Sequence, residues 1–311
     1  MHRNALLECH ERIQPYIHKT PILQSTLINE IADANIFFKC ENFQKTGAYK
    51  MRGAANAIML LSDEQRAKGV ITHSSGNFAQ ALSLAAKSLG VKAHIVMPDN
   101  SPEVKKMAVK EYDGIIHTSE ATLEDRQAKT NALIAETGAT FIHPSNDINV
   151  IYGQGTAALE LLLEEPSLNY LFTPVGGGGL IAGSSLSAHY FGNNCKVIGG
   201  EPLEADDAYR SLLSGKIETN ETANTIADGL RTQLGDVNFP IIREHVSEII
   251  RVEEHEIINA MRLVWERMKI IIEPSSAVAL AAVLKEKSRF KDQNIGIIVS
   301  GGNVDISRLP F

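Results

Sequence analysis

Lys50 is the first residue with a candidate chemical role, because a lysine amine becomes a nucleophile and a base when it loses its proton. It lies in residues 43–54, after an apolar run at 36–39 and before a helical pattern at 54–61. This spacing places Lys50 at a strand-to-helix junction, where partial burial lowers the pKa of an amine. Taken alone, a lysine is more often an ordinary solvated side chain, so its interpretation depends on three further motifs.

A second motif, at residues 72–80, follows an expected strand and opens an expected helix. It contains, in order, Ser74, Ser75, Gly76, Asn77 and Phe78. Ligands of open α/β sheets bind at this edge, and the free amides at a helix start attract a carboxylate. Taken alone, the motif is equally well explained as a capped glycine turn.

A third motif is the glycine run Gly176, Gly177, Gly178 and Gly179, again between a strand and a helix. Ordering four glycines costs backbone entropy, so a plain connection is a poor use of them. They suit a ring of amides around a phosphate at the helix start. The spacing of Gly176, Gly178 and Gly183 is not that of a dinucleotide loop, which argues against a nicotinamide dehydrogenase.

The fourth motif, at residues 299–305, is a strand that ends in Ser300 and two glycines. Taken alone it has no assignable role. Combined, a junction lysine, an amide-rich turn, a glycine ring and a serine at a strand end are the parts needed to hold pyridoxal phosphate.

Helical and strand-like segments alternate along almost the whole chain, which predicts an α/β fold with mostly parallel sheets and helices on both faces. Strands are expected at 36–39, 70–73, 93–97, 114–117, 140–142, 170–175, 196–199, 248–252 and 295–299. Helices are expected at 5–13, 54–61, 77–89, 101–112, 121–137, 153–165, 180–190, 253–268 and 275–287, with Ser101 as cap and Pro102 in the first turn of the fourth. The compact middle block predicts a small domain at 69–146, and residues 1–68 with 147–311 form the large domain.

Charge and cysteine usage exclude several classes of protein. The 311 residues carry a formal net charge of −7, which argues against nucleic acid or an anionic membrane as a partner. Cys9, Cys40 and Cys195 are far apart and odd in number, so reduced thiols are expected rather than a disulfide framework. No apolar run reaches the length that spans a membrane, and a cytoplasmic protein is expected.

Together the four motifs resemble the fold-type II pyridoxal-phosphate enzymes, and within them the serine/threonine dehydratase and serine racemase family. Their order matches along nearly the whole chain. The resemblance implies two open, twisted sheets of the tryptophan synthase β type and a homodimer. It also implies that Lys50 binds the cofactor covalently and that Tyr49 packs beside it. Asn77 would then bind the phenolic oxygen, Gly176, Gly177, Gly178 and Gly179 the phosphate, and Ser300 the pyridine nitrogen, left unprotonated by a neutral hydroxyl.

For the reaction, the resemblance implies α,β-elimination from an L-β-hydroxy amino acid of the serine or threonine type. Lys50 takes the Cα proton, the β-hydroxyl leaves, and a 2-oxo acid and ammonia result. Ser74 to Phe78 would grip the substrate carboxylate. The alternative is a serine or aspartate-type racemase, in which Ser75 returns a proton to the opposite face. A β-replacement enzyme and a non-catalytic binding module are less favoured alternatives.

The resemblance also implies a cation site. Glu201, the carbonyl of Ala205 and Asp207 match a segment that ligates Mg²⁺, or alternatively Mn²⁺ or Ca²⁺, and oxygen ligands suit such hard cations. An acidic loop is, however, often only a solvated face. The chain departs from the family at Phe78, where histidine is common, and this leaves the preferred substrate side chain open.

Overall fold

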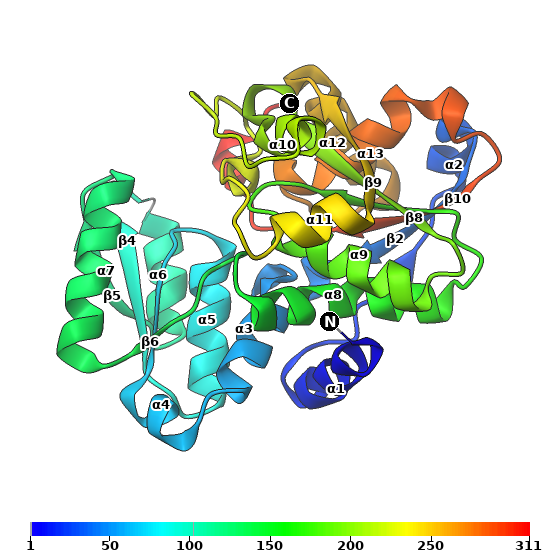
Figure 1. The fold of residues 1–311 in the computed structure, drawn as a ribbon. Helices are drawn as coiled ribbons and strands as arrows, with labels where there is room; N and C mark the ends of the chain where they lie inside the picture. Colours follow the sequence, from blue (N-terminus) through cyan, green and yellow to red (C-terminus); the bar gives the residue numbers. More distant parts are fainter. Residues whose placement is uncertain (1, 102) are drawn as a thin grey trace.

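Two separate sheets organise the chain. The computed structural model describes residues 2–101 and 103–311, so the expectation for Pro102 lies outside the described residues (Figure 1). One sheet has six strands in the order β1-β2-β10-β7-β8-β9, and the other has four in the order β5-β4-β3-β6. The predicted α/β class with mostly parallel sheets is confirmed, since only β1 pairs in the antiparallel sense among the described strands.

The six-stranded sheet is built around the strand that comes last in the sequence. Its members are β1 (Ile22–Leu23), β2 (Asn35–Cys40), β7 (Tyr170–Pro174), β8 (Lys196–Pro202), β9 (Val246–Val252) and β10 (Asn294–Val299). β10 lies between β2 and β7 and is buried almost throughout, as its continuous apolar sequence predicts for a parallel strand covered on both faces. One face packs on α2 (Thr26–Ala32), α12 (Glu254–Met268) and α13 (Pro274–Lys285).

The opposite face of the six-stranded sheet packs on α8 (Ile148–Glu164) and α9 (Gly179–Phe191), with α1 (Arg3–Ile13) and α11 (Phe239–His245) beside them. We call this sheet and its helices the large unit. It also includes α10 (Asp207–Ser214), so the weakly periodic segment after β8 contains short helices, as the sequence predicts.

The four-stranded sheet forms a separate small unit. Its strands are β3 (Val70–His73), β4 (Ala93–Pro98), β5 (Ile115–Ser119) and β6 (Thr140–Phe141). Figure 1 shows α5 (Asn77–Ser88), α6 (Glu103–Glu111) and α7 (Leu123–Thr137) around it, and α3 (Lys50–Met59) and α4 (Asp63–Lys68) precede it. The strands of this sheet fall between residues 70 and 141. The exact domain boundaries at 68/69 and 146/147 stay a prediction.

α8 begins five residues earlier than its predicted start. Asp147 caps it by accepting hydrogen bonds from the amides of Asn149 and Val150. Its Gly153 and Gly155 are not helix breakers here, because each allows a close approach of two backbones. A Cβ on Gly153 would lie 2.5 Å from the carbonyl oxygen of Arg52, and one on Gly155 would lie 2.5 Å from that of Gly183. Tertiary packing therefore overrides the low helix propensity of glycine.

A buried ionic network joins α3 to its neighbours. Arg52, with no exposed surface, donates from Nε and Nη2 to Glu41 at 2.7 and 2.8 Å and from both Nη atoms to Glu160 at 2.8 and 2.9 Å. Lys39 Nζ lies 2.7 Å from Glu160 and donates to the carbonyl oxygen of Thr20. Because every charge in it has a partner, the network fixes α3, and with it Lys50, against β2 and α8.

The structure describes the three cysteines and the lengths of the helices. Cys9, Cys40 and Cys195 are free and buried. Within residues 2–101 and 103–311, the structure contains no helix with the length and apolar character needed to cross a bilayer.

Candidate active site

Lys50 opens α3 and points toward the junction of the two units. Its side chain is half-buried, and Nζ donates a 2.8 Å hydrogen bond to the carbonyl oxygen of Pro144. Nζ also lies 5.0 Å from the ring centre of Tyr49 and 5.8 Å from that of Phe78. Burial lowers the pKa of the amine to about 8, against the opposing charge of Glu273. Lys50 is therefore poised to exchange a proton near neutral pH.

The Lys50 segment is tied to the end of β10. The amide of Tyr49 donates to the carbonyl oxygen of Ser300 at 3.0 Å, and Ala48 and Gly301 form an isolated β-bridge. Ser300 is buried, and its Oγ lies 2.9 Å from Oγ of Ser276. The structure thus brings Lys50, Tyr49 and Ser300 together although 250 residues separate the ends of this set.

Asn77 begins α5 and is held by two side chains of the large unit. Its Nδ2 donates to both carboxylate oxygens of Glu273, at 3.0 and 3.1 Å, and its Oδ1 accepts from Asn303 Nδ2 at 2.9 Å. Burial raises the pKa of Glu273 to about 7, against the hydrogen bond from Asn77. A second group that titrates near neutral pH therefore lies in the same site as Lys50.

The turn between β3 and α5 contains the residues that the sequence predicts for binding the substrate carboxylate. Ser74, Ser75, Gly76 and Asn77 are partly accessible, and the amides of a helix start have no intrahelical acceptor. Phe78 differs from the others because only 2 % of it is exposed and it packs in the core between α3 and α5. Its ring therefore forms an apolar wall near Lys50 Nζ and offers no polar contact.

The glycine run lies at the amino end of α9, where the predicted phosphate ring is expected. Gly178, with φ of +78°, is its N-cap. A Cβ on Gly176 would lie 2.7 Å from Leu230 Cα, and one on Gly177 would lie 2.5 Å from Ser145 Oγ. Glycine is therefore required at these positions by the close packing of Leu230 and Ser145. The amides at the start of α9 have no intrahelical acceptor, and this chemistry fits the phosphate of pyridoxal phosphate.

His143 is a further neighbour of Lys50. Its Nδ1 accepts from the amides of Ser145 and Asn146 at 3.2 and 2.8 Å, so the ring hydrogen is on Nε2. Burial, with the nearby His73 and Lys50, lowers the pKa of His143 to about 4. The imidazole is therefore neutral at physiological pH, with one fixed hydrogen-bond donor.

Comparison with known proteins decides what this geometry belongs to. Residues 13–301 match the family described as "Pyridoxal-phosphate dependent enzyme". The chain belongs to this family. Serine racemase from Dictyostelium discoideum is 53 % identical over 97 % of this chain and 94 % of that protein. The crystal structure of serine racemase from the same organism superposes with a TM-score of 0.94 at 51 % identity, and the match covers 97 % of this chain and 98 % of the other. The beta-hydroxyaspartate dehydratase of Paracoccus denitrificans (strain Pd 1222) is 46 % identical over 98 % of this chain and 97 % of that protein.

As a member of the pyridoxal-phosphate dependent enzymes, the chain has functional candidates that sequence reasoning missed. Glu273 and Ser276 flank the start of α13, and Glu273 followed by Pro274 was visible only as a helix-start signal. His143 had no ligand spacing to distinguish it. Tertiary structure alone brings Glu273 to Asn77, Ser276 to Ser300 and His143 near Lys50.

The expected cation ligands form a separate cluster in the large unit. Glu201 is fully buried and accepts from the amides of Ala208 and Tyr209, at 2.9 and 2.8 Å. Asp207 is also fully buried and accepts from Asn220 Nδ2 at 2.7 Å and from the amide of Leu234 at 3.1 Å.

Two buried carboxylates in one cluster need a compensating charge. Burial, then the neighbouring Asp207, raises the pKa of Glu201 well above its usual value, and burial raises that of Asp207 to about 6. The adjacent Asp206 forms ion pairs with Arg210 and Arg251, at 2.7 and 2.9 Å. Among the described residues no cluster of three or more His, Cys, Asp or Glu is arranged for a metal. Carboxylate oxygens are nevertheless the donor type that hard cations prefer.

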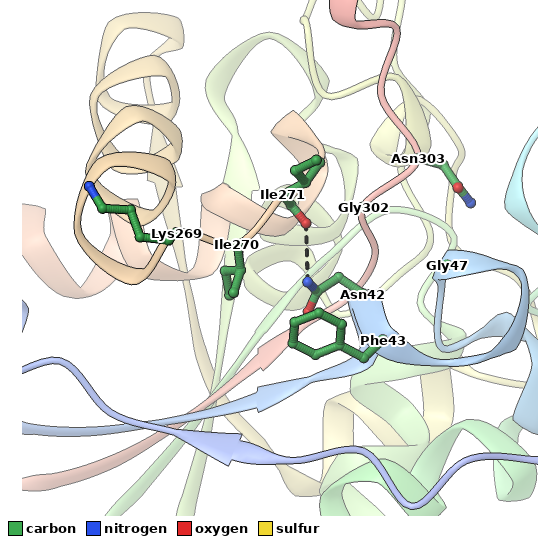
Figure 2. A pocket seen from close by; sticks show the side chains of 8 residues that line it. All are labelled: Asn42, Phe43, Gly47, Lys269, Ile270, Ile271, Gly302 and Asn303. Carbon is green, nitrogen blue, oxygen red and sulfur yellow. Dashed lines mark hydrogen bonds between the residues drawn. The ribbon is translucent and has the colours of Figure 1, made fainter.

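A pocket of about 390 Å³ lies beside Gly47, three residues before Lys50. Figure 2 shows Asn42, whose Nδ2 donates to the carbonyl oxygen of Ile271 at 3.1 Å, with Phe43 beside it. Gly47 and Asn303 form another part of its lining. The pocket thus shares Asn303 with the candidate active site without including Lys50.

Proposed function

We propose that this protein is a pyridoxal-phosphate-dependent dehydratase, an ammonia-lyase, that converts an L-β-hydroxy amino acid to a 2-oxo acid and ammonia. The observation that carries the proposal is the half-buried amine of Lys50, with a pKa of about 8, between the Ser74–Phe78 turn and the glycine run. The dehydratase among the similar proteins supports elimination over simple binding.

Each predicted residue has a separate task in this proposal. Lys50 and Tyr49 hold the cofactor ring from the large unit, Asn77 binds its phenolic oxygen and Ser300 its pyridine nitrogen. Gly176, Gly177, Gly178 and Gly179 bind its phosphate. When bound, the cofactor supplies an electron sink that makes the Cα proton of the substrate acidic.

Substrate binding and proton transfer fall to residues of this chain. The turn formed by Ser74, Ser75, Gly76 and Asn77 binds the substrate carboxylate through helix-start amides, and Phe78 excludes water from one side. Lys50 takes the Cα proton in its neutral form. Its lowered pKa places a large fraction of the amine in that form at pH 8.

Racemisation is the second candidate function, because a similar protein is a serine racemase. Ser75 would then return a proton on the face opposite Lys50. In the Ser75→Ala variant we expect 2-oxo acid release to continue while inversion falls by about 100-fold, the usual effect of losing one acid–base group. Equal loss of both products would contradict separate roles for the two residues.

The first test is 2-oxo acid release from L- and D-serine, threonine and 3-hydroxyaspartate, followed by chiral analysis of the remaining amino acid. Oxo acid from one of them with little inversion supports the dehydratase, and inversion with little oxo acid supports the racemase. If neither 2-oxo acid nor inverted amino acid is formed, a β-replacement enzyme is favoured.

Replacing Lys50 tests the proposed site itself. We expect Lys50→Ala to lose the visible absorbance of the bound cofactor and to reduce turnover by more than about 1,000-fold, since both covalent attachment and proton transfer are lost. An active Lys50→Ala variant with an intact visible band contradicts the assignment.

The remaining proposals concern the ion and the assembly. We propose that Glu201, the Ala205 carbonyl and Asp207 bind Mg²⁺, or Mn²⁺ or Ca²⁺ in its place, and that the protein is a cytoplasmic homodimer. Phe43 and Ile271 are large apolar side chains that line one pocket and are about half exposed. Exposed apolar side chains of this size support an interface with a second copy of the chain. Sedimentation at the monomer mass would contradict the dimer.

A further inference from the structure

One ion pair joins the two units. Lys105 Nζ of α6 lies 2.8 Å from Asp228 Oδ2, in the short helix Asp228–Leu230 of the large unit. The other ion pairs among the described side chains connect residues within one unit. The pair therefore reports directly on the distance between the units.

The Asp228 side of the pair belongs to the wall of the candidate site. The amide of Gly229 donates to Ser275 Oγ at the start of α13, at 3.0 Å. Leu230 packs so closely on the glycine run that its Cα would lie 2.7 Å from a Cβ on Gly176. Asp228 is thus anchored to the two segments that border the proposed phosphate ring and Glu273.

The Lys105 side of the pair belongs to the unit that carries the proposed carboxylate grip. α6 packs against α5, whose first residues include Asn77 and Phe78. Moving the small unit away from the large unit would separate Lys105 from Asp228 and Asn77 from Glu273 together. Both charges also act on Glu273, since Asp228 raises its pKa and Lys105 lowers it.

The pair is suited to breaking and re-forming. The side chains of Lys105 and Asp228 are 27 % and 47 % exposed, and ion pairs with this exposure add little to the stability of a fold. Their effect falls instead on the balance between two arrangements of the units that differ in whether the pair exists.

We propose that Lys105 and Asp228 form a latch that holds the small unit closed over the site and so positions the carboxylate-binding turn against Lys50. The inference rests on the proposed function for its kinetic test. Lys105 and Asp228 are positioning residues, because neither touches the predicted reacting atoms. Closure of this kind excludes water and commits the bound substrate.

The test compares the charge-reversed single variants Lys105→Glu and Asp228→Lys with the exchanged pair that combines them, all as holoenzymes. We expect the single variants to raise KM by about tenfold with kcat within about twofold, because the binding-competent closed fraction falls. The exchanged pair restores most of the loss. Lys87→Met is the matched control, since it removes a 3.0 Å ion pair with Asp113 that lies inside the small unit.

Hydrogen exchange gives a readout that does not require turnover. Segments 74–80 and 225–232 are expected to exchange several-fold faster in Lys105→Glu than in the native protein, with recovery in the exchanged pair and no change in Lys87→Met. If the native protein shows no turnover but these exchange changes appear, the function is wrong and the latch stands. Unchanged exchange in the single variants, or an exchanged pair as impaired as its parents, overturns the latch.

Discussion

At the scale of single residues, two titratable groups define the candidate site. Lys50 and Glu273 have pKa values shifted toward each other, to about 8 and about 7, because both are buried. Lys50 was predictable from its motif. Glu273 was not, since a helix-capping glutamate looks the same in sequence whether it is solvated or, as here, 3 % exposed.

Replacing Glu273 by Gln tests the buried carboxylate. Its folded pKa of about 7 is above the usual 4.5, so the native protein binds more protons than the unfolded chain between these values and stability falls as pH rises through them. Glu273→Gln keeps an acceptor for Asn77 and removes this loss. We expect the cofactor-free variant to match the native protein below pH 4.5 and to be more stable by up to about 3 kcal/mol above pH 7.

Thermal unfolding of the two cofactor-free proteins from pH 4 to pH 8 measures the difference. A constant offset across this range would show that Glu273 does not change its protonation between the folded and unfolded states near neutral pH.

At the scale of elements, the alternation of strands and helices was readable because each expected strand is apolar and bounded by turn residues. The starts of elements were less predictable. α3 begins at Lys50 rather than at residue 54, and α8 begins at Ile148, since contacts with distant backbone stabilise turns that contain glycine. Single-chain patterns do not contain these contacts.

The crossing of α8 and α9 depends on glycine. A Cβ on Gly183 would lie 2.3 Å from the carbonyl oxygen of Ile151 and 2.6 Å from the amide nitrogen of Gly155, and backbone atoms cannot yield as a flexible side chain can. We expect Gly183→Ala to cost about 3 kcal/mol in the free energy of unfolding.

Gly76→Ala is the control, because no atom lies within 4 Å of its added Cβ and its φ is −123°. Denaturant unfolding of both variants measures the costs. Equal stabilities would show that the two helices separate without penalty.

At the scale of the whole molecule, the candidate site exists only where the two units meet. Ser300 and the glycine run belong to the large unit, Ser75 and Asn77 belong to the small one, and Lys50 opens α3, which packs against both α5 and α8. The sequence order of the motifs predicted their membership in one site, but not the contacts of Asn77 with Glu273 and Asn303, which depend on the packing between units.

The proposed cation site affects the large unit as a whole, since Glu201 and Asp207 connect β8 to the segments that contain Asn220 and Leu234. Neutralising two buried carboxylates stabilises the folded state. We expect excess Mg²⁺ to raise Tm by about 5 °C over a chelated sample. Asp207→Asn should abolish this difference, and the exposed Glu204→Gln should keep it. An equal Tm with Mg²⁺ and with chelator would contradict the proposed cation site.

The position of β10 has a consequence for how the protein is made. β10 (Asn294–Val299) is the last strand to be synthesised, yet it lies between β2 and β7 in the middle of the six-stranded sheet. Until then β2 and β7 each lack a neighbour, whereas every strand of the small unit has been synthesised by residue 141. The nascent chain can therefore complete its small sheet more than 150 residues before its large one, and the cofactor site is among the last parts to form.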